Sequence, residues 1–358
     1  MKKLFLLSAA ALMVLASCTK DEVDQTPDQK ITFSSPVVSV ATKANVPGEI
    51  VKYPDGEQFK VFAVHHESTF DTWKDKHIYM KGVTCTYDNT DKNWQPSPSY
   101  YWPKVGKLTF AAYSPAVADG TFAYGEGGLT INGYTTPEVS KQYDLLYSER
   151  TYNRTTSSDS ATDEGEDQGK DYKGVDIKFN HALSSIVFTV KTSEDYSDGA
   201  TITLKNITLN NINSHGNFTE NVTEGATYAS NPTWTSATPI DYSPIIQTSD
   251  KPFSQIVNSG TAQTITNAHP LLMIPQNLNN AKVTVVYTIK SHTSEPIEQT
   301  QEIVLSTVDH DTSKDEVQAE WILGKRYTYV ITIALNKIYF DPYVETWKDV
   351  TLTSVPVL

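Results

Sequence analysis

Short runs in which apolar and polar residues alternate constrain the fold of this chain more than any other feature. Such alternation places the apolar side chains on one face of an extended strand. Turn residues separate the runs, and no convincing amphipathic helix longer than about two turns is present. The clearest runs are residues 59–64, 107–113, 185–190, 201–204, 282–287 and 327–333. The sequence therefore predicts an all-β protein made of sandwiches or barrels.

A polar, acidic stretch interrupts this pattern near the middle of the chain. Residues 151–173 are rich in Ser, Thr, Asp, Glu and Gly and contain almost no apolar residue. Such a segment cannot bury enough surface to offset the entropy cost of ordering it. We therefore predict an N-terminal domain over residues 44–173, ending in this acidic loop, and a C-terminal domain over residues 174–358. The carboxylates of the loop match no EF-hand spacing, so no metal site is predicted there.

The N-terminus carries the features of an export signal. A positive start is followed by an apolar run over residues 4–15, which is too short to span a bilayer. Small residues then lead directly into Cys18, and acidic, polar sequence follows it. This arrangement resembles the lipobox of bacterial lipoproteins, so we predict a signal peptide over residues 1–17 and a lipid on Cys18. A plain secretory signal with a chance cysteine is the alternative.

The predicted lipid would be the only membrane attachment, because no other apolar run approaches about 20 residues. The acidic residues after Cys18 resemble a surface-export signal, which favours a location at the outer membrane or cell surface. If Cys18 carries the lipid, Cys85 has no disulfide partner in the chain. Cys85 alternates with threonines, so we predict that it faces the core of a strand.

The composition and motifs exclude several functions. A net charge of −13 argues against nucleic acid as a partner, because no basic patch can replace phosphate counterions. Signature motifs of serine hydrolases, nucleotide-binding loops and dinucleotide-binding folds are missing, and His65 and His66 lack the spacing of a zinc helix. We therefore predict no catalytic residue, no metal and no cofactor. A carboxylate pair for glycoside hydrolysis depends on tertiary geometry and stays open.

Five segments taken together resemble the fimbrillin (Mfa-like) family, whose members are subunits of type V pili. They occur in the order of the family and extend over nearly the whole chain behind the lipobox. The segments are residues 42–44 followed by 56–63, then 179–188, 272–276, 321–329 and 338–347.

This resemblance implies two tandem transthyretin-like β-sandwich domains and a particular route of assembly. Subunits of the family reach the surface as lipoproteins, and a trypsin-like protease then removes the lipid together with the first strand. A strand from a neighbouring pilus subunit fills the groove that is left, by β-augmentation. The partners implied are therefore that protease and other pilus subunits, and the product is released into a fimbria.

Transferred to this chain, the resemblance places the removable strand within residues 18–43 and the cut between Lys43 and Ala44. Arginine is the usual residue before the cut in the family, whereas this chain has lysine. The strand would extend from Ile31 to Ala41. Its apolar residues predicted to share one face are Ile31, Phe33, Val37 and Ala41.

The C-terminal tail is the candidate donor strand. Val350, Leu352 and Leu358 share one parity, whereas Val355 and Val357 have the other. Pro356 cannot donate a hydrogen bond to a β-ladder. The alternative is that residues 350–358 complete the sheet of their own domain.

We therefore expect a structural or adhesive subunit of a type V pilus, without enzymatic activity. The alternative function is a surface-anchored lipoprotein that binds a glycan or another host ligand through its aromatic residues. Six tryptophans could form a platform for sugars, although packing in the core is the favoured interpretation for them.

Overall fold

The computed structural model describes residues 30–39, 50–67, 77–103, 106–154, 174–196, 199–223, 229–242, 255–260, 262–265, 270–291, 293–307, 320–335 and 338–346. Within these ranges the regular structure is β, apart from two single-turn 3-10 helices at Val139–Lys141 and Leu305–Thr307. The prediction of an all-β protein is confirmed. None of the helices in the described part of the chain is long and apolar enough to cross a membrane.

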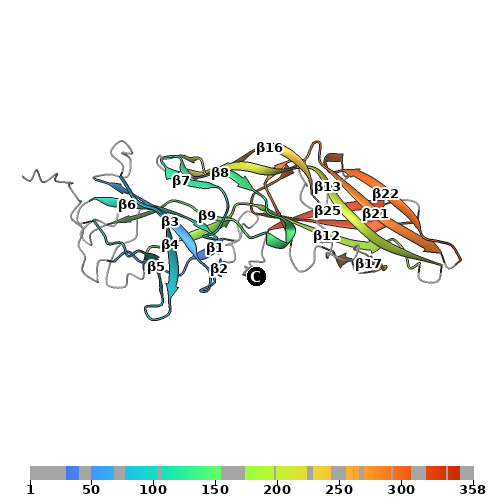
Figure 1. Ribbon diagram of the computed structural model, residues 1–358, viewed down its shortest axis with the longest axis horizontal. Helices are drawn as coiled ribbons and strands as arrows, with labels where there is room; N and C mark the ends of the chain where they lie inside the picture. Colours follow the sequence, from blue (N-terminus) through green and yellow to red (C-terminus); the bar gives the residue numbers. More distant parts are fainter. Residues whose placement is uncertain are drawn as a thin grey trace, which may run out of the picture.

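Nine strands form one sheet, the N-terminal sheet. They are β1 (Val37–Ser39), β2 (Ile50–Lys52), β3 (Phe59–His66), β4 (His77–Asp88), β5 (Asn93–Ser97), β6 (Lys107–Ser114), β9 (Leu146–Ser148), β10 (Thr151–Arg154) and β11 (Lys178–His181). Their order is β2-β1-β11-β9-β6-β3-β4-β5, and β10 also pairs with β6. This sheet lies in the blue and green half of the elongated molecule (Figure 1).

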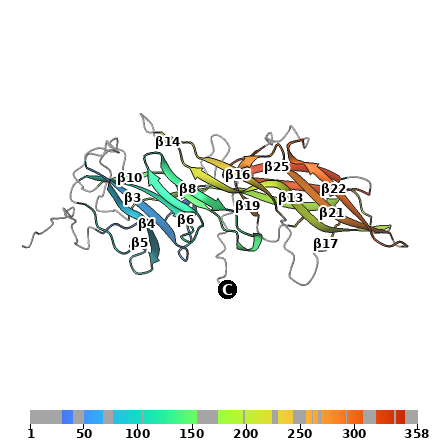
Figure 2. The same ribbon diagram turned by 45° about the horizontal axis from the view of Figure 1, so that its top comes forward.

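Seven strands form a second sheet, the long sheet. They are β7 (Thr121–Gly125), β8 (Gly128–Thr135), β13 (Ala200–Thr219), β16 (Thr233–Tyr242), β17 (Gln255–Ile256), β21 (Lys282–Ser291) and β22 (Ile297–Val304). The order along it is β22-β21-β13-β8-β7, with β16 and β17 also paired to β13. Because β13 is 20 residues long, one end pairs with β21 and the other with β8. It therefore ties the two halves of the molecule together (Figure 2).

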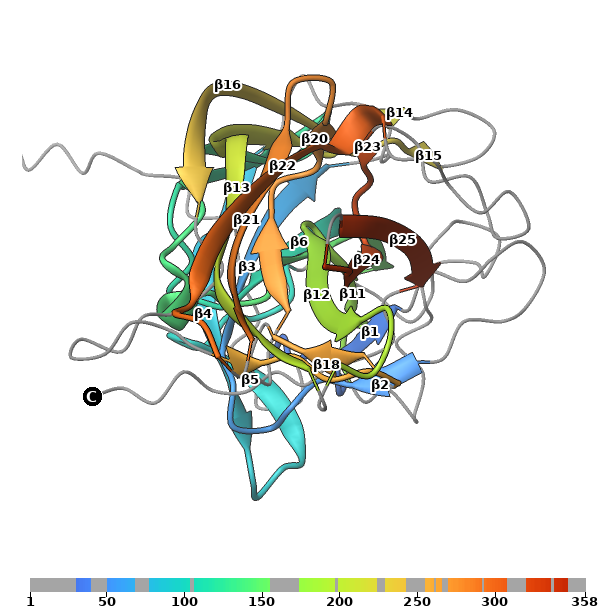
Figure 3. The same ribbon diagram turned by 90° about the vertical axis from the view of Figure 1, so that its right-hand side faces the viewer.

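A third sheet of five strands faces the long sheet in the C-terminal half. Its strands are β12 (Ser184–Thr192), β18 (Gln263–Thr264), β19 (Leu271–Met273), β24 (Lys325–Ile333) and β25 (Ile338–Thr346). Two small pairs complete the structure: β14 (Val222–Thr223) with β15 (Ala229–Ser230), and β20 (Gln276–Asn277) with β23 (Glu320–Trp321). The view along the molecule shows β12, β24 and β25 opposite β13 and β21 (Figure 3).

Three apolar clusters fill the molecule. One lies within the N-terminal sheet and includes Phe33, Phe59 and Phe110, and a second lies between the two sheets of the C-terminal half. The third joins the halves, since it packs residues such as Phe62 of β3 against Phe218 of β13. The halves thus share both a sheet and a core, and the division at residues 173 and 174 stays a prediction.

Cys85 and several tryptophans lie in these cores. Cys85 is fully buried on β4, as its alternation with threonine predicts, and burial raises the pKa of its thiol. Trp94, Trp102 and Trp321 are 0–4% exposed. The packing interpretation is therefore confirmed for these three side chains, which are not available to a sugar-binding platform.

Buried tyrosines make the stability sensitive to alkaline pH. Burial raises the pKa of Tyr113 and of Tyr327 to about 12, whereas an unfolded chain releases the phenol proton near pH 10, roughly. Between these values the unfolded state binds fewer protons than the folded state. The contribution of these tyrosines to stability is therefore fully present below about pH 10 and is lost as the pH rises from there toward about 12. The slope is about 1.4 kcal/mol per pH unit for each such tyrosine.

We expect the variant Tyr113→Phe to reduce this alkaline slope by about one proton, because phenylalanine has no phenol to titrate. The packing should be kept, since the ring of residue 113 stacks on Phe122 with 3.6 Å between centroids. Denaturant unfolding followed by circular dichroism between pH 9 and 12, approximately, would measure the slope. An unchanged slope would show that the Tyr113 phenol titrates normally in the folded protein.

Candidate functional site

The segment of residues 30–39 is held by backbone hydrogen bonds on both of its edges. On one edge, the N–H of Phe33 donates to the carbonyl of Trp94 in β5 (2.8 Å), and the N–H of Trp94 donates back to Phe33 (2.9 Å). The N–H of Ile31 donates to the carbonyl of Tyr100 (2.8 Å). These bonds make the first half of the segment an antiparallel neighbour of β5.

The opposite edge of the segment pairs in parallel with the chain that leads into β11. The N–H of Val175 donates to the carbonyl of Thr32 (2.8 Å), and the N–H of Ser34 donates to Val175 (3.0 Å). Farther along, the N–H of Val37 donates to Ile177 (3.1 Å), where β1 pairs with β11. The segment therefore lies between two other strands along its length, as an interior strand does.

This position closes the N-terminal sheet on itself. The path β11-β9-β6-β3-β4-β5 ends at β5, and residues 30–33 bridge from β5 to Val175 just before β11. Without the segment, β5 and the chain before β11 would each present unpaired N–H and carbonyl groups. The segment thus occupies a groove that has a β-edge on either side.

Large aromatic side chains form the floor of this groove. Phe33 is 0% exposed and packs edge-on against Phe59 (5.9 Å between centroids) and Phe110 (5.8 Å). Ile31 is 1% exposed and belongs to the same cluster. Burial of side chains this large stabilises the segment by roughly 1.5–3 kcal/mol for each fully buried large apolar residue.

The buried positions of the segment do not keep a single parity. Ile31 and Phe33 are buried, but Val37 is only half-buried, and Pro36 and Val38 are buried instead. The prediction that Val37 shares the face of Ile31 and Phe33 is therefore not met, and Ala41 lies outside the described residues.

A β-bulge causes this change of parity. Phe33 is opposite Val175 and Val37 is opposite Lys178, so four steps on the segment match three on its partner. One extra residue in a strand moves every later side chain to the other face. At the same place the second edge changes partner from β5 to β2, since the N–H of Tyr53 donates to Pro36 (2.9 Å) and Val37 is opposite Lys52.

Gly174 lies directly against the backbone of the segment at Phe33 and Ser34, and we call this close contact the seat of the segment. Its φ is +117°, and a Cβ atom built there would lie 2.5 Å from the carbonyl carbon of Phe33 and 2.6 Å from the nitrogen of Ser34. Only glycine allows this backbone conformation and this approach without strain. The local sequence gives no signal for the role of Gly174, because the contact joins residues about 140 positions apart.

The remaining predicted site residues lie outside the described part of the chain. These are Cys18, Lys43, Ala44, Val350, Leu352, Val355, Val357 and Leu358. The structure does define the strands that flank the predicted cut: residues 40–49 connect β1 to β2, which pair antiparallel with Ser39 opposite Ile50.

Two of the sequence motifs have structural roles, one in the core of the N-terminal half and one in the core of the C-terminal half. In the motif at residues 179–188, Phe179 packs on Tyr53 and Phe59, and Nδ1 of buried His181 lies 2.8 Å from Oδ2 of Asp144. In the motif at residues 321–329, the indole N–H of Trp321 donates to the hydroxyl of Tyr329 (2.8 Å). These contacts join neighbouring elements of the fold, and we assign them a structural role.

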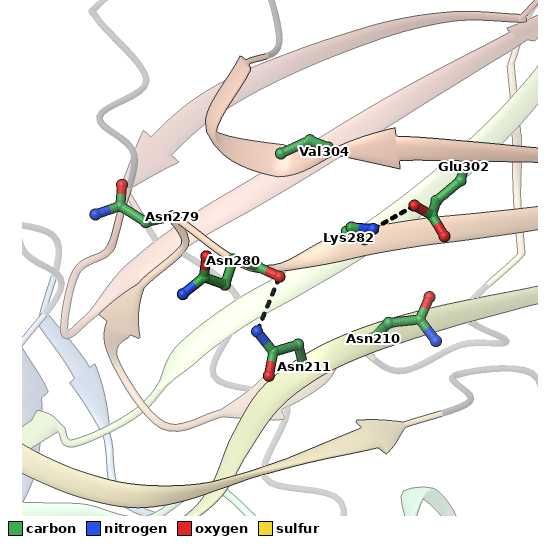
Figure 4. A pocket seen from close by; sticks show the side chains of 7 residues that line it. All are labelled: Asn210, Asn211, Asn279, Asn280, Lys282, Glu302 and Val304. Carbon is green, nitrogen blue, oxygen red and sulfur yellow. Dashed lines mark hydrogen bonds and ion pairs between the residues drawn. The ribbon is translucent and has the colours of Figure 1, made fainter.

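A polar depression lies on the long sheet, where β13 and β22 meet the turn before β21 (Figure 4). Asn211 donates from Nδ2 to the carbonyl of Asn280 (2.9 Å), and Lys282 forms an ion pair with Glu302. The residues that line the depression are Asn210, Asn211, Asn279, Asn280, Lys282, Glu302 and Val304. This lining contains no aromatic ring on which a sugar could stack.

Among the residues that the structure describes, no group of three or more His, Cys, Asp or Glu could hold a metal ion.

Comparison with known proteins agrees with this architecture. A fimbrial protein from Bacteroides vulgatus of known structure is 17% identical, with a TM-score of 0.57, and the match covers 89% of this chain and 100% of that one. At such low identity the likeness shows the fold alone. No curated protein matches the sequence.

Two further solved structures are more distant. One, from Bacteroides uniformis and classed only provisionally as a cell adhesion protein, is 16% identical with a TM-score of 0.46, over 89% of this chain and 99% of that one. The other, the tip fimbrial protein Mfa3 from Porphyromonas gingivalis with a C-terminal truncation, is 10% identical with a TM-score of 0.32, over 88% and 99%. With TM-scores below 0.5, neither adds to the assignment of the fold.

The sequence itself gives the assignment. The model of one protein family, described as fimbrillin-like, matches residues 42–347, which is most of the chain. This range contains the five segments that resemble the fimbrillin family. The chain belongs to the fimbrillin-like family.

Proposed function

We propose that this chain is a structural subunit of a type V fimbria at the cell surface. In this proposal Cys18 carries a lipid that delivers the chain to the outer membrane, and a trypsin-like protease cuts between Lys43 and Ala44. Strand exchange with another subunit then follows. The observation that carries the proposal is the position of residues 30–39, which fill a groove between two β-edges and close the N-terminal sheet.

Loss of this segment would create a strong site for another strand. The backbone groups of Trp94, Val175 and Ile177 that now bond the segment would lose their partners. The rings of Phe59 and Phe110 would lose their cover. Unpaired edges beside an apolar floor favour capture of an extended strand, whose main chain restores the ladder and whose side chains fill the floor.

The proposed cut leaves the described strands whole. Lys43 lies in the stretch between β1 and β2, so cleavage there separates the two strands without interrupting either. The segment would then be held only by non-covalent contacts, while β2 would stay with the mature chain. An incoming strand could therefore pair with β2 as β1 does now.

We expect Lys43→Gln to block processing, because a trypsin-like protease requires a basic residue before the cut. Intact-mass spectrometry of protein taken from the cell surface should show a chain starting at Ala44 for the wild type. The variant should keep its acylated Cys18 and form no ladder of polymers on an unheated denaturing gel. Lys52→Gln in β2 is the matched control and should be processed normally. A wild-type chain that keeps Cys18, or a variant still cut at this bond, would contradict the proposal.

A further inference from the structure

Glycine directly follows an aspartate or an asparagine at four places in this chain. The pairs are Asp55–Gly56, Asp119–Gly120, Asn132–Gly133 and Asp198–Gly199. Glycine has no side chain to shield its backbone nitrogen, so this nitrogen can attack the side-chain carbonyl carbon of the residue before it. The attack closes a cyclic imide, which water reopens in part as isoaspartate. Whether a folded chain reacts in this way depends on how the fold holds each pair.

At Asp119–Gly120, just before β7, the reacting groups already face each other. The N–H of Gly120 donates to Oδ1 of Asp119 (2.9 Å), so the nitrogen points at the carboxyl group whose carbon it would attack. The backbone of Asp119 is held as well, because its own N–H donates to the hydroxyl of Tyr143 (2.8 Å). Gly120 has a φ of +107°, which glycine adopts without strain. The fold thus holds this pair near the geometry of the reaction, which raises the rate of ring closure.

Solvent reaches this pair from outside. Asp119 is exposed, and Val117 in the same loop between β6 and β7 is 84% exposed. Ring closure requires a proton for the carboxyl group, and ring opening requires a water molecule. Exposure to solvent supplies both.

We infer that Asp119–Gly120 is a site of spontaneous backbone isomerisation, at which Asp119 becomes isoaspartate. The carboxyl group of Asp119 takes up a proton, the nitrogen of Gly120 bonds to its carbon, and the hydroxyl group leaves with the N–H proton as water. A second water molecule then adds to the former main-chain carbonyl of Asp119 and breaks its bond to the nitrogen. The chain afterwards continues through the side-chain carboxyl carbon. Nothing is oxidised or reduced, and the inference does not depend on strand exchange.

The neighbouring pair Asn132–Gly133 is held in a different way. Asn132 lies in β8, opposite Thr121 of β7. The N–H of Gly133 donates to Oδ1 of Asn217 in β13 (2.8 Å), so its nitrogen is engaged by another side chain. In the folded chain Asn132 should therefore react more slowly than Asp119, although glycine follows both residues.

Isomerisation at Asp119 should loosen the start of the β7–β8 ladder. The reaction inserts the side-chain methylene into the main chain, directly before Thr121 pairs with Asn132. Space is tight there, since a Cβ atom built at Gly120 would lie 3.0 Å from Cγ2 of Ile131. Ile131 belongs to the core that joins the two halves of the molecule. The modified chain should therefore lose amide protection in β7 and β8.

Peptide mapping after incubation in heavy-oxygen water tests the inference. The full chain is kept folded in a mildly acidic buffer, and each opening of an imide leaves one heavy oxygen in the peptide concerned. Fragmentation by electron transfer then distinguishes isoaspartate from aspartate. Asp55–Gly56 is the reference, because it is the same dipeptide and is exposed, in a turn closed by the bond from the N–H of Glu57 to the carbonyl of Pro54 (3.1 Å).

In the folded chain, Asp119 should gain heavy oxygen at least about tenfold faster than Asp55, since its reacting groups are held together. In denaturant the two rates should become similar, because the fold no longer positions either pair. Asp119→Glu is the matched variant: it keeps the carboxylate but requires a larger ring, so the label should disappear from this peptide alone. Equal labelling of Asp119 and Asp55 in the folded chain would overturn the inference. Faster labelling of Asn132 than of Asp119 would do the same, because the identity of the dipeptide rather than its geometry would then set the rate.

Discussion

Phe33→Ala should lower the free energy of unfolding of the intact chain by about 3–5 kcal/mol, the usual cost of removing a fully buried aromatic side chain. The ring is 0% exposed and touches Phe59 and Phe110 edge-on, so its loss leaves a cavity between rings that the β-ladders on both sides keep from collapsing. Denaturant unfolding followed by tryptophan fluorescence is a suitable measurement, because Trp94 is bonded directly to Phe33.

Val37→Ala is the matched control for this variant. It lies in the same segment but is half-buried, so its truncation should cost about 1 kcal/mol or less. Equal losses for the two variants would show that the fully buried ring of Phe33 contributes no more than the half-buried side chain of Val37. A loss below about 1 kcal/mol for Phe33→Ala would show that the segment is not part of the stable core.

Gly174→Ala is the second substitution for which we expect a large effect. It should displace residues 30–34 from the groove. The residue has a φ of +117°, which costs a non-glycine residue about 1–3 kcal/mol. In addition, the new Cβ would lie 2.5 Å from the backbone of Phe33, where no side-chain movement can relieve the contact. Hydrogen exchange should therefore show lost protection at the amides of Phe33 and Trp94, which bond each other.

The same substitution at Gly127 separates the effect of the seat from that of alanine itself. Nothing lies within 4 Å of a Cβ built at Gly127, and its φ is outside the left-handed region. Gly127→Ala should therefore change stability by no more than about 0.5 kcal/mol and leave protection of Phe33 unchanged. If Gly174→Ala behaved in the same way, the close approach of the segment to Gly174 could not be what positions it.

Both variants also bear on assembly, because the proposed incoming strand would use the same floor and the same seat. Phe33→Ala weakens only the resident segment, which the proposed processing would remove, so ladders should still form and form faster after the cut. Gly174→Ala changes the groove itself, so ladders should weaken. Opposite effects of the two variants on ladder formation would distinguish a residue of the segment, Phe33, from a residue of the groove itself, Gly174.

The sequence by itself determined the class of the fold, the family and several core residues. Alternation of apolar and polar residues is a local property with a period of two, so it predicts strands and places Cys85 in the core without knowledge of their neighbours. The five family segments could be found because their order along the chain is itself information in the sequence, and the family model covers them.

Only the tertiary structure decided how residues 30–39 are held. The bonds to Trp94 and Val175, the seat at Gly174 and the shift of burial from Val37 to Val38 all depend on contacts between residues about 60–140 positions apart. Local periodicity predicts one face for Ile31, Phe33 and Val37, because it contains no information on a bulge that arises from mismatched lengths in two paired chains.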